Sequence, residues 1–189
     1  MAATPSIRST LFAATCLGAI FVSTGLMSFA HAQDDSYEVS ALPTEIAAIG
    51  TGELDCDLDD AIPSFGFQAL ELEDGGTLFN VPCQTADVNI EAYIAKLEPD
   101  GGVTVFSFAT EPGDNAEAYK TAINPEVLKN GLIVRSNSFY GPDANCGVLD
   151  THELSEDGTA YDLVERREKT DCSGDYIPPV TYPVIWSAN

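Results

Sequence analysis

The chain has few basic residues and very few histidines. Eight lysines and arginines stand against 30 aspartates and glutamates in 189 residues, and histidine occurs twice. Nucleic acids and anionic membrane surfaces are bound largely through lysine and arginine, so this balance argues against both as partners. Phosphate-binding glycine loops and dinucleotide fingerprints are also lacking, and we therefore expect no nucleotide and no other cofactor.

The first 32 residues contain no acidic residue and a single cation, Arg8, which precedes an apolar run over residues 11–22. Ala30 and Ala32 then place small residues at the first and third positions before a cut, as in an export signal. The pattern predicts cleavage after Ala32 and a periplasmic or secreted location, with no membrane segment left. An uncut membrane anchor is the alternative, since about 20 apolar residues can span a bilayer.

Removal of the signal leaves seven cations against 30 carboxylates. Residues 33–41 are polar for the most part and are expected to be flexible. Residues 42–189 are enough for one domain with a sizeable core, so a single domain is predicted there. This large surplus of carboxylates over cations gives a strongly negative net charge, which keeps an exported protein soluble and also suits a cationic partner.

Four cysteines remain after cleavage, namely Cys56, Cys83, Cys146 and Cys172. An even number in an exported chain indicates disulfides, with three connectivities possible. Cys56 with Cys83 and Cys146 with Cys172 is the preferred pairing, because each pair brackets an Asp-Gly turn. A zinc site is the competing use, but no pair has the close spacing of zinc ligands.

Short strands dominate the predicted secondary structure. Three Asp-Gly turns separate segments that alternate with a period of two, which favours a mainly β fold, with α+β possible. We expect an antiparallel sandwich or barrel of about eight short strands with one or two short helices and two disulfides. The predicted strands are residues 65–72, 77–81, 88–97, 103–108, 132–137, 147–154, 159–167 and 182–186.

Three segments depart from simple strands. Residues 42–49 have apolar residues at helical spacing and stop at Gly50, so a short helix is predicted. Residues 111–130 are expected to form a loop or lid with helices near 117–123 and 125–129. In residues 88–97, Ile94 alternates with Tyr93 and its neighbours, as in a ribbon with one buried face.

Several segments resemble a bacterial family of exported proteins known only as domain of unknown function 1176. They are residues 78–83 (LFNVPC), 145–147 (NCG), 161–168 (YDLVERRE), 171–174 (DCSG) and 182–186 (YPVIW). The resemblance covers residues 42–186, and this stretch is similar to the C-terminal part of longer members of the family. It implies export and a disulfide-bonded fold, and it implies no catalytic residue. The chain departs from the family at residues 84–87 and 150–152, where the family has aromatic elements.

Individual residues offer few candidate sites. Asp55, Asp57 and Asp59 alternate like the ligands of a calcium loop, although the glycine and glutamate that such a loop requires are absent, and a solvated acidic loop is the alternative. His152 is expected to be an exposed strand residue without a catalytic role, because no Gly-x-Ser-x-Gly elbow accompanies it. Trp186 is expected to pack in the core with Tyr182 and Ile185.

The sequence therefore predicts a non-enzymatic structural or binding domain with a cationic protein or peptide as partner. The alternative is a carboxylate-based hydrolase acting on a glycan or another extracellular substrate, which requires a concave site that contains acids. Four of the seven cations, Arg135, Arg166, Arg167 and Lys169, could form a small basic patch. We expect instead that they pair with carboxylates of the same chain.

Overall fold

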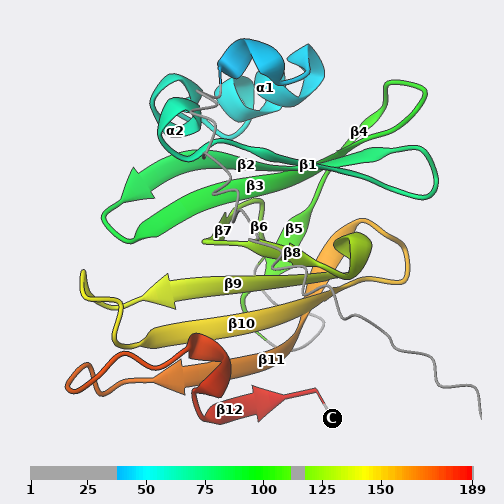
Figure 1. Ribbon diagram of the computed structural model, residues 1–189. Helices are drawn as coiled ribbons and strands as arrows, with labels where there is room; N and C mark the ends of the chain where they lie inside the picture. Colours follow the sequence, from blue (N-terminus) through cyan, green and yellow to red (C-terminus); the bar gives the residue numbers. More distant parts are fainter. Residues whose placement is uncertain (1–37, 112–117, 189) are drawn as a thin grey trace, which may run out of the picture. The chain divides into compact units, whose positions relative to one another are not determined.

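The computed structural model describes residues 38–111 and 118–188, which lie within one compact unit, Asp35–Asn189. The predicted export signal and residues 33–37 fall outside the described residues. The described part begins with a 3₁₀ turn, η1 (Val39–Ala41), followed by helices α1 (Thr44–Gly52) and α2 (Leu58–Phe65). Strands make up most of the remainder (Figure 1).

The first sheet has five antiparallel strands, of which four follow the order β1-β2-β3-β4. The fifth, β7, pairs with residues 91–92 of β3, whereas β4 pairs with residues 95–97 of the same strand. The long central pair, β2 and β3, forms a hairpin that carries most of this sheet. The strands are β1 (Gln68–Glu71), β2 (Thr77–Ala86), β3 (Asn89–Leu97), β4 (Val103–Val105) and β7 (Ala122–Ile123).

The second sheet has seven strands in the order β6-β5-β11-β10-β9-β8, with β12 also paired to β11. All its pairings are antiparallel except the parallel pair β5 and β11. The chain crosses from the first sheet to the second at Phe106, between β4 and β5. The strands are β5 (Ser107–Ala109), β6 (Ala118–Tyr119), β8 (Glu126–Leu128), β9 (Ile133–Phe139), β10 (Gly147–Leu154), β11 (Ala160–Lys169) and β12 (Val184–Ser187).

Two apolar cores hold three layers together, as Figure 1 shows for the helices, the first sheet and strands β9 to β11. Phe79 and Val81 of β2 face α1 and α2, together with Tyr93 of β3. Leu78 and Ile94 point to the other face of the same sheet, where they pack against residues of the second sheet. The predicted antiparallel sandwich of a mainly β fold is therefore confirmed, with the two short helices as an outer layer.

The helical layer makes the prediction of a half-buried β3 wrong. Ala92, Tyr93, Ile94 and Ala95 are all buried, because α1 and α2 cover one face of the strand while the second sheet covers the other. Alternation in the sequence could not reveal this arrangement, since both faces carry residues that tolerate burial.

The region after residue 117 also differs from the prediction. The two expected helices are replaced by the short strands β6, β7 and β8, which add to edges of the two sheets. Pairing with existing strands satisfies their backbone groups more completely than two isolated short helices could. The remainder of the expected lid, residues 112–117, lies outside the described residues.

Helix α2 was not predicted, and its N-terminus accounts for the acidic residues Asp57, Asp59 and Asp60. Asp57 is the N-cap, and its side chain accepts a hydrogen bond from the backbone N–H of Asp60 at 3.3 Å. Asp59 and Asp60 occupy the first turn, where negative charge is favourable to the helix dipole. The strand predicted from residue 65 consequently starts later, at Gln68.

The C-terminal strand differs from the prediction in its burial. Tyr182 is buried, as expected, but Ile185 is 53% exposed and Trp186 is only half-buried. Both lie on β12, which pairs with β11 on one side only and leaves its other edge without a pairing strand among the described residues. Trp186 is therefore not a core residue.

Candidate functional site

A cavity of about 270 Å³ is lined by strands of both sheets, and we call it the inter-sheet cavity. Its polar lining comes from Glu91 on β3, from two serines of β9 and from Asp150 and His152 on β10. Phe108 and Tyr119 contribute aromatic walls. Its volume is slightly below the range of about 300–1,000 Å³ that is usual for small-molecule sites, so it fits a side chain or a small ligand.

His152 is the most deeply buried polar residue of this cavity, with only 2% of its surface exposed. Its Nε2 lies 3.0 Å from the carbonyl oxygen of Ala109, which can only accept, so Nε2 carries the proton. Nδ1 has no hydrogen-bond partner among the described residues. The ring packs edge-on against Phe108, with a centroid distance of 5.6 Å. The prediction of an exposed His152 is wrong, because the inner face of β10 is covered by the first sheet and β5.

Burial lowers the pKa of His152, since the cavity wall desolvates the charged imidazolium. The backbone carbonyls of Ala109 and Val134 and the carboxylate of Asp150 act in the opposite direction, while the guanidinium of Arg166 reinforces the lowering. The ring is therefore neutral near pH 7, with Nδ1 as a hydrogen-bond acceptor.

Asp150 is held by Arg166 in a bidentate ion pair. Nε of Arg166 lies 2.7 Å from Oδ1 of Asp150, and Nη2 lies 2.7 Å from Oδ2. The same Nη2 donates to the carbonyl oxygen of Thr110 at 2.8 Å. The carboxylate raises the pKa of the Arg166 guanidinium, mainly through these hydrogen bonds. The charge of Asp150 is thus compensated within the protein.

Glu91 carries the negative charge of the cavity that is not compensated. Its carboxylate accepts a hydrogen bond from the hydroxyl of Thr121, and no ion pair joins it to a cation among the described residues. Lys120 precedes Thr121, but its ammonium group pairs with Glu53 at the end of α1. The side chain of Glu91 is half-buried at the cavity wall. Its charge is therefore available to a ligand.

Two asparagines fix one end of the two sheets relative to each other. The side chain of Asn89 on β3 bonds to both the N–H and the carbonyl of Phe139 on β9, each at 2.9 Å. Asn124 accepts from the N–H of Ile90 and donates to the carbonyl of Asn137. These bonds replace strand pairing between the sheets and hold the cavity walls in place.

A larger cavity of about 410 Å³ lies at the other end of the sandwich, and several of its polar groups are already partnered. Lys96 pairs with Asp74 and Glu98, and the phenol of Tyr161 donates to the carbonyl of Gly131 at 2.6 Å. Its floor is apolar, with Leu78 and other leucines. Glu73, Lys129 and Asn130 also line it, but none of the buried polar atoms that lack a hydrogen-bond partner in the described residues belongs to this lining. Nδ1 of His152 is such an atom, so the inter-sheet cavity is the better candidate site.

The three aspartates of the candidate calcium loop are not brought together as a metal site. No group of three or more His, Cys, Asp or Glu side chains that could hold a metal ion occurs in residues 38–111 and 118–188. Asp57 caps α2, Asp59 belongs to its first turn, and Asp55 adopts a left-handed backbone with φ of 54°. Asp57 and Asp59 thus stabilise the start of α2.

Of the four clustered cations, Arg166 and Arg167 pair with carboxylates as expected, whereas Lys169 and Arg135 form no ion pair among the described residues. Arg166 pairs with Asp150, and Arg167 pairs with Glu165 at 2.6 Å. Lys169 donates to the backbone carbonyls of Asn145 and Asp171. Nε of Arg135 is buried without a hydrogen-bond partner in the described residues. These residues therefore do not form a free basic patch.

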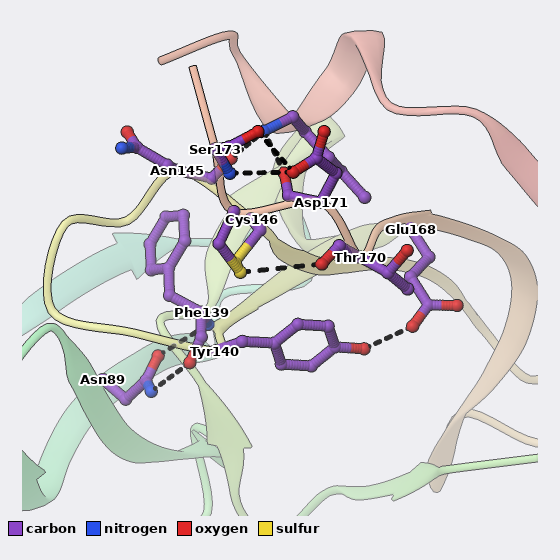
Figure 2. The surroundings of a disulfide bond; sticks show 11 residues. Asn89, Phe139, Tyr140, Asn145, Cys146, Glu168, Thr170, Asp171 and Ser173 are labelled. Carbon is purple, nitrogen blue, oxygen red and sulfur yellow. Dashed lines mark hydrogen bonds between the residues drawn. A yellow bond between two sulfur atoms is a disulfide. The ribbon is translucent and has the colours of Figure 1, made fainter. Parts of the chain in front are cut away.

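The preferred disulfide pairing is confirmed, with bonds Cys56–Cys83 and Cys146–Cys172. Figure 2 shows the second bond beside Phe139 and Tyr140, whose phenol donates to Glu168. The dashed contact from sulfur to the carbonyl of Thr170 spans 3.6 Å, and a disulfide sulfur has no proton to donate. This bond ties the segment after β11 to the start of β10, next to the strands that line the inter-sheet cavity.

Comparison of the chain with family models, curated proteins and solved structures finds no match. The resemblance to domain of unknown function 1176 therefore stays a prediction, and function is argued from the cavity and the charges alone. Sequence reasoning missed that Glu91 and Asp150 line one cavity with His152 and that Arg166 pairs with Asp150. The available signal was the spacing of Asp150 and His152, two positions apart on one predicted strand and hence on one face.

Proposed function

We propose that this protein is an exported, non-enzymatic binding domain that works in the periplasm or outside the cell and binds a cationic protein or peptide. Support for the location comes from the two disulfides, which persist in oxidising compartments. No helix within residues 38–111 and 118–188 has the length and apolar character needed to cross a membrane.

The observation that carries the binding proposal is the surplus of carboxylates after internal pairing. Lys96, Lys120, Arg166 and Arg167 form ion pairs with carboxylates among the described residues, and these pairs engage five of the chain's 30 acidic side chains. Most of the negative charge therefore faces solvent or a partner. Such a field attracts cationic ligands and accelerates their association at low ionic strength.

The test is a titration of the full, oxidised chain with a short lysine-rich peptide and with a glutamate-rich peptide of the same length. We expect binding of the lysine-rich peptide alone, with an affinity that falls steeply between low and physiological salt because surface charges are screened. Isothermal titration calorimetry measures both. Absence of binding to the lysine-rich peptide at low ionic strength would overturn the proposal.

A carboxylate-based hydrolase is the second candidate, and the presence of Glu91 and Asp150 on one cavity favours it. Asp150 is engaged in a bidentate ion pair with Arg166, so Glu91 is the cavity carboxyl left to act as the acid of such a pair. Release of reducing ends from peptidoglycan or chitin oligosaccharides, lost in Glu91→Gln, would establish this activity. Wild-type protein without turnover on such substrates supports the binding domain instead.

A further inference from the structure

We infer that the inter-sheet cavity is the specificity pocket of this binding domain and that it accepts one primary ammonium group on an alkyl stem, as carried by a lysine side chain. The inference rests on the proposed function and names the group that the site recognises. Three features of the cavity carry it: its charge, its unpartnered acceptor and its size.

The uncompensated charge of the cavity favours the binding of one monovalent cation. Asp150 and Arg166 compensate each other through two hydrogen bonds of 2.7 Å, and His152 is neutral. Glu91 alone remains as a half-buried carboxylate without a cationic partner in the described part of the chain. A carboxylate at a cavity wall that has no cationic partner in the protein attracts a monovalent ligand of opposite charge.

The unpartnered acceptor calls for a hydrogen-bond donor. Nδ1 of His152 is buried with no hydrogen-bond partner among the described residues, while Nε2 is fixed as a donor by the carbonyl of Ala109. Buried polar atoms are nearly always hydrogen-bonded, so an exception at a cavity wall indicates where a ligand atom belongs. An ammonium group has three donors and no acceptor, which matches Glu91 and Nδ1. The hydroxyl groups of Ser136 and Ser138 line the same cavity.

The size and the walls of the cavity call for a narrow apolar stem. Its volume of about 270 Å³ accommodates one extended side chain. Phe108, Tyr119 and Val148 supply apolar surface for methylene groups, and aromatic faces attract a nearby cation. Lysine combines an alkyl stem with a compact terminal charge, whereas arginine carries a planar fork best suited to bidentate carboxylates.

The ligand comparison uses the wild-type chain and three matched probes: the Nα-acetyl methylamides of lysine, arginine and norleucine. Norleucine has the same methylene stem without the ammonium group. Calorimetry should show tightest binding for the lysine probe and at least about tenfold weaker binding for norleucine, as expected when a charge-assisted hydrogen bond is lost. Equal affinity for lysine and norleucine would overturn the inference.

The residue comparison uses Glu91→Gln, which retains an acceptor for Thr121 and removes the charge. We expect its affinity for the lysine probe to fall about 10- to 100-fold. Glu153→Gln is the matched control, because Glu153 is an exposed residue of β10 adjacent to His152 on the opposite face and makes the same change in net charge. Equal losses in the two variants would show that the cavity has no special role.

A spectroscopic readout reports directly on His152. In a His31→Ala background, His152 is the sole histidine, so its two ring nitrogens give one set of ¹⁵N signals. Saturation with the lysine probe should shift the Nδ1 signal and leave Nε2 nearly unchanged. No shift of Nδ1 at saturation would contradict the proposed contact.

These outcomes separate the inference from the proposed function. If the lysine-rich peptide binds in a salt-sensitive manner and Glu91→Gln does not change its affinity, the lysine pocket is contradicted and the proposed binding function is retained. If the wild-type chain does not bind that peptide at all, both proposals are contradicted. Loss with Glu91→Gln, retention with Glu153→Gln and a shifted Nδ1 together establish the lysine pocket.

Discussion

The phenol of Tyr93 donates a hydrogen bond of 2.9 Å to the backbone carbonyl of Ile46, although 47 residues separate them in the chain. Tyr93 and Ile46 both have 0% of their surface exposed. Burial raises the pKa of Tyr93, so the phenol remains a donor at any pH at which the fold is stable. The bond joins α1 to the central strand β3, and thereby fixes the helical layer on the face of the first sheet away from the inter-sheet cavity.

Replacement of Tyr93 by phenylalanine should lower the free energy of unfolding by about 0.5–1.5 kcal/mol, the usual net value of one hydrogen bond. The ring and its packing remain, so the loss reports on the phenol alone. Urea unfolding followed by circular dichroism measures it. Tyr176→Phe, at a 56% exposed position, is the control and should change stability by less than about 0.5 kcal/mol. Equal effects would mean that the Tyr93 bond contributes nothing.

Gly147 permits a close approach of strands β9 and β10 in the second sheet. Its φ is 156°, and a Cβ there would collide with the carbonyl oxygen of Ser138 and lie 2.9 Å from the Cα of Phe139. These are backbone atoms of the paired strand β9, which cannot give way without opening the β9–β10 ladder.

Gly147→Ala should therefore destabilise the protein by about 1–3 kcal/mol or more, as overpacking in a rigid site does. Thermal melting and urea unfolding measure the loss. Gly141→Ala is the matched control, because a Cβ at Gly141 meets nothing within 4 Å. A Gly147→Ala protein as stable as the Gly141→Ala protein would show that the strands can separate without cost.

The two disulfides differ in their accessibility to a reductant. Cys56 and Cys83 are both buried in the core under α2, whereas Cys172 is exposed although Cys146 is buried. We expect Cys146–Cys172 to be reduced first under native conditions, because a thiolate must reach a sulfur atom. Alkylation after timed exposure to dithiothreitol, read by mass spectrometry, gives the order. Earlier labelling of Cys56 and Cys83 would contradict this expectation.

Sequence patterns predicted the features that depend on local chemistry. The Asp-Gly turns place Gly75, Gly101 and Gly158 at positive φ, where glycine is the least strained residue. These turns define the hairpins, and the β10–β11 hairpin brings Cys146 close to Cys172, since Gly147 is paired with Lys169. Cys56 instead precedes α2, which packs on β2, and the N–H of Asp57 donates to the carbonyl of Cys83. The turn signal therefore predicted the first pairing correctly, although the hairpin alone does not bring its cysteines together.

Features that depend on distant contacts were not predictable from the same patterns. Tyr93 is buried because α1 lies above it, and His152 is buried because β5 and the first sheet cover it. The strand β7 owes its conformation to its pairing with β3, since two residues, Ala122 and Ile123, are too short a segment to form a strand alone. The inter-sheet cavity combines residues from strands far apart in the sequence, and no local spacing records that combination.

Burial of His152 also makes stability depend on pH in a window that carboxylates do not share. The folded-state pKa lies below the ordinary value of 6.5, so the unfolded chain binds more protons as the pH falls below that value. The stabilising contribution is complete above pH 6.5 and is lost as the pH falls toward the folded-state pKa. Asp150 and Arg166 are the charged groups beside the ring, and they form an ion pair with each other.

The free energy of unfolding should therefore fall as the pH drops below about 6.5, by up to about 1.4 kcal/mol for each pH unit. His152→Gln, which retains a donor for the carbonyl of Ala109, should flatten this slope, and His31 cancels because both proteins contain it. Urea unfolding at a series of pH values measures both curves. Carboxylates such as Asp74 and Asp157, whose pKa values are lowered by hydrogen bonds to Lys96 and to Ser155 respectively, lose their contribution only at lower pH. Parallel curves for the two proteins would show that the imidazole takes up its proton in the folded state without penalty, and that the cavity around it is wetter than its walls indicate.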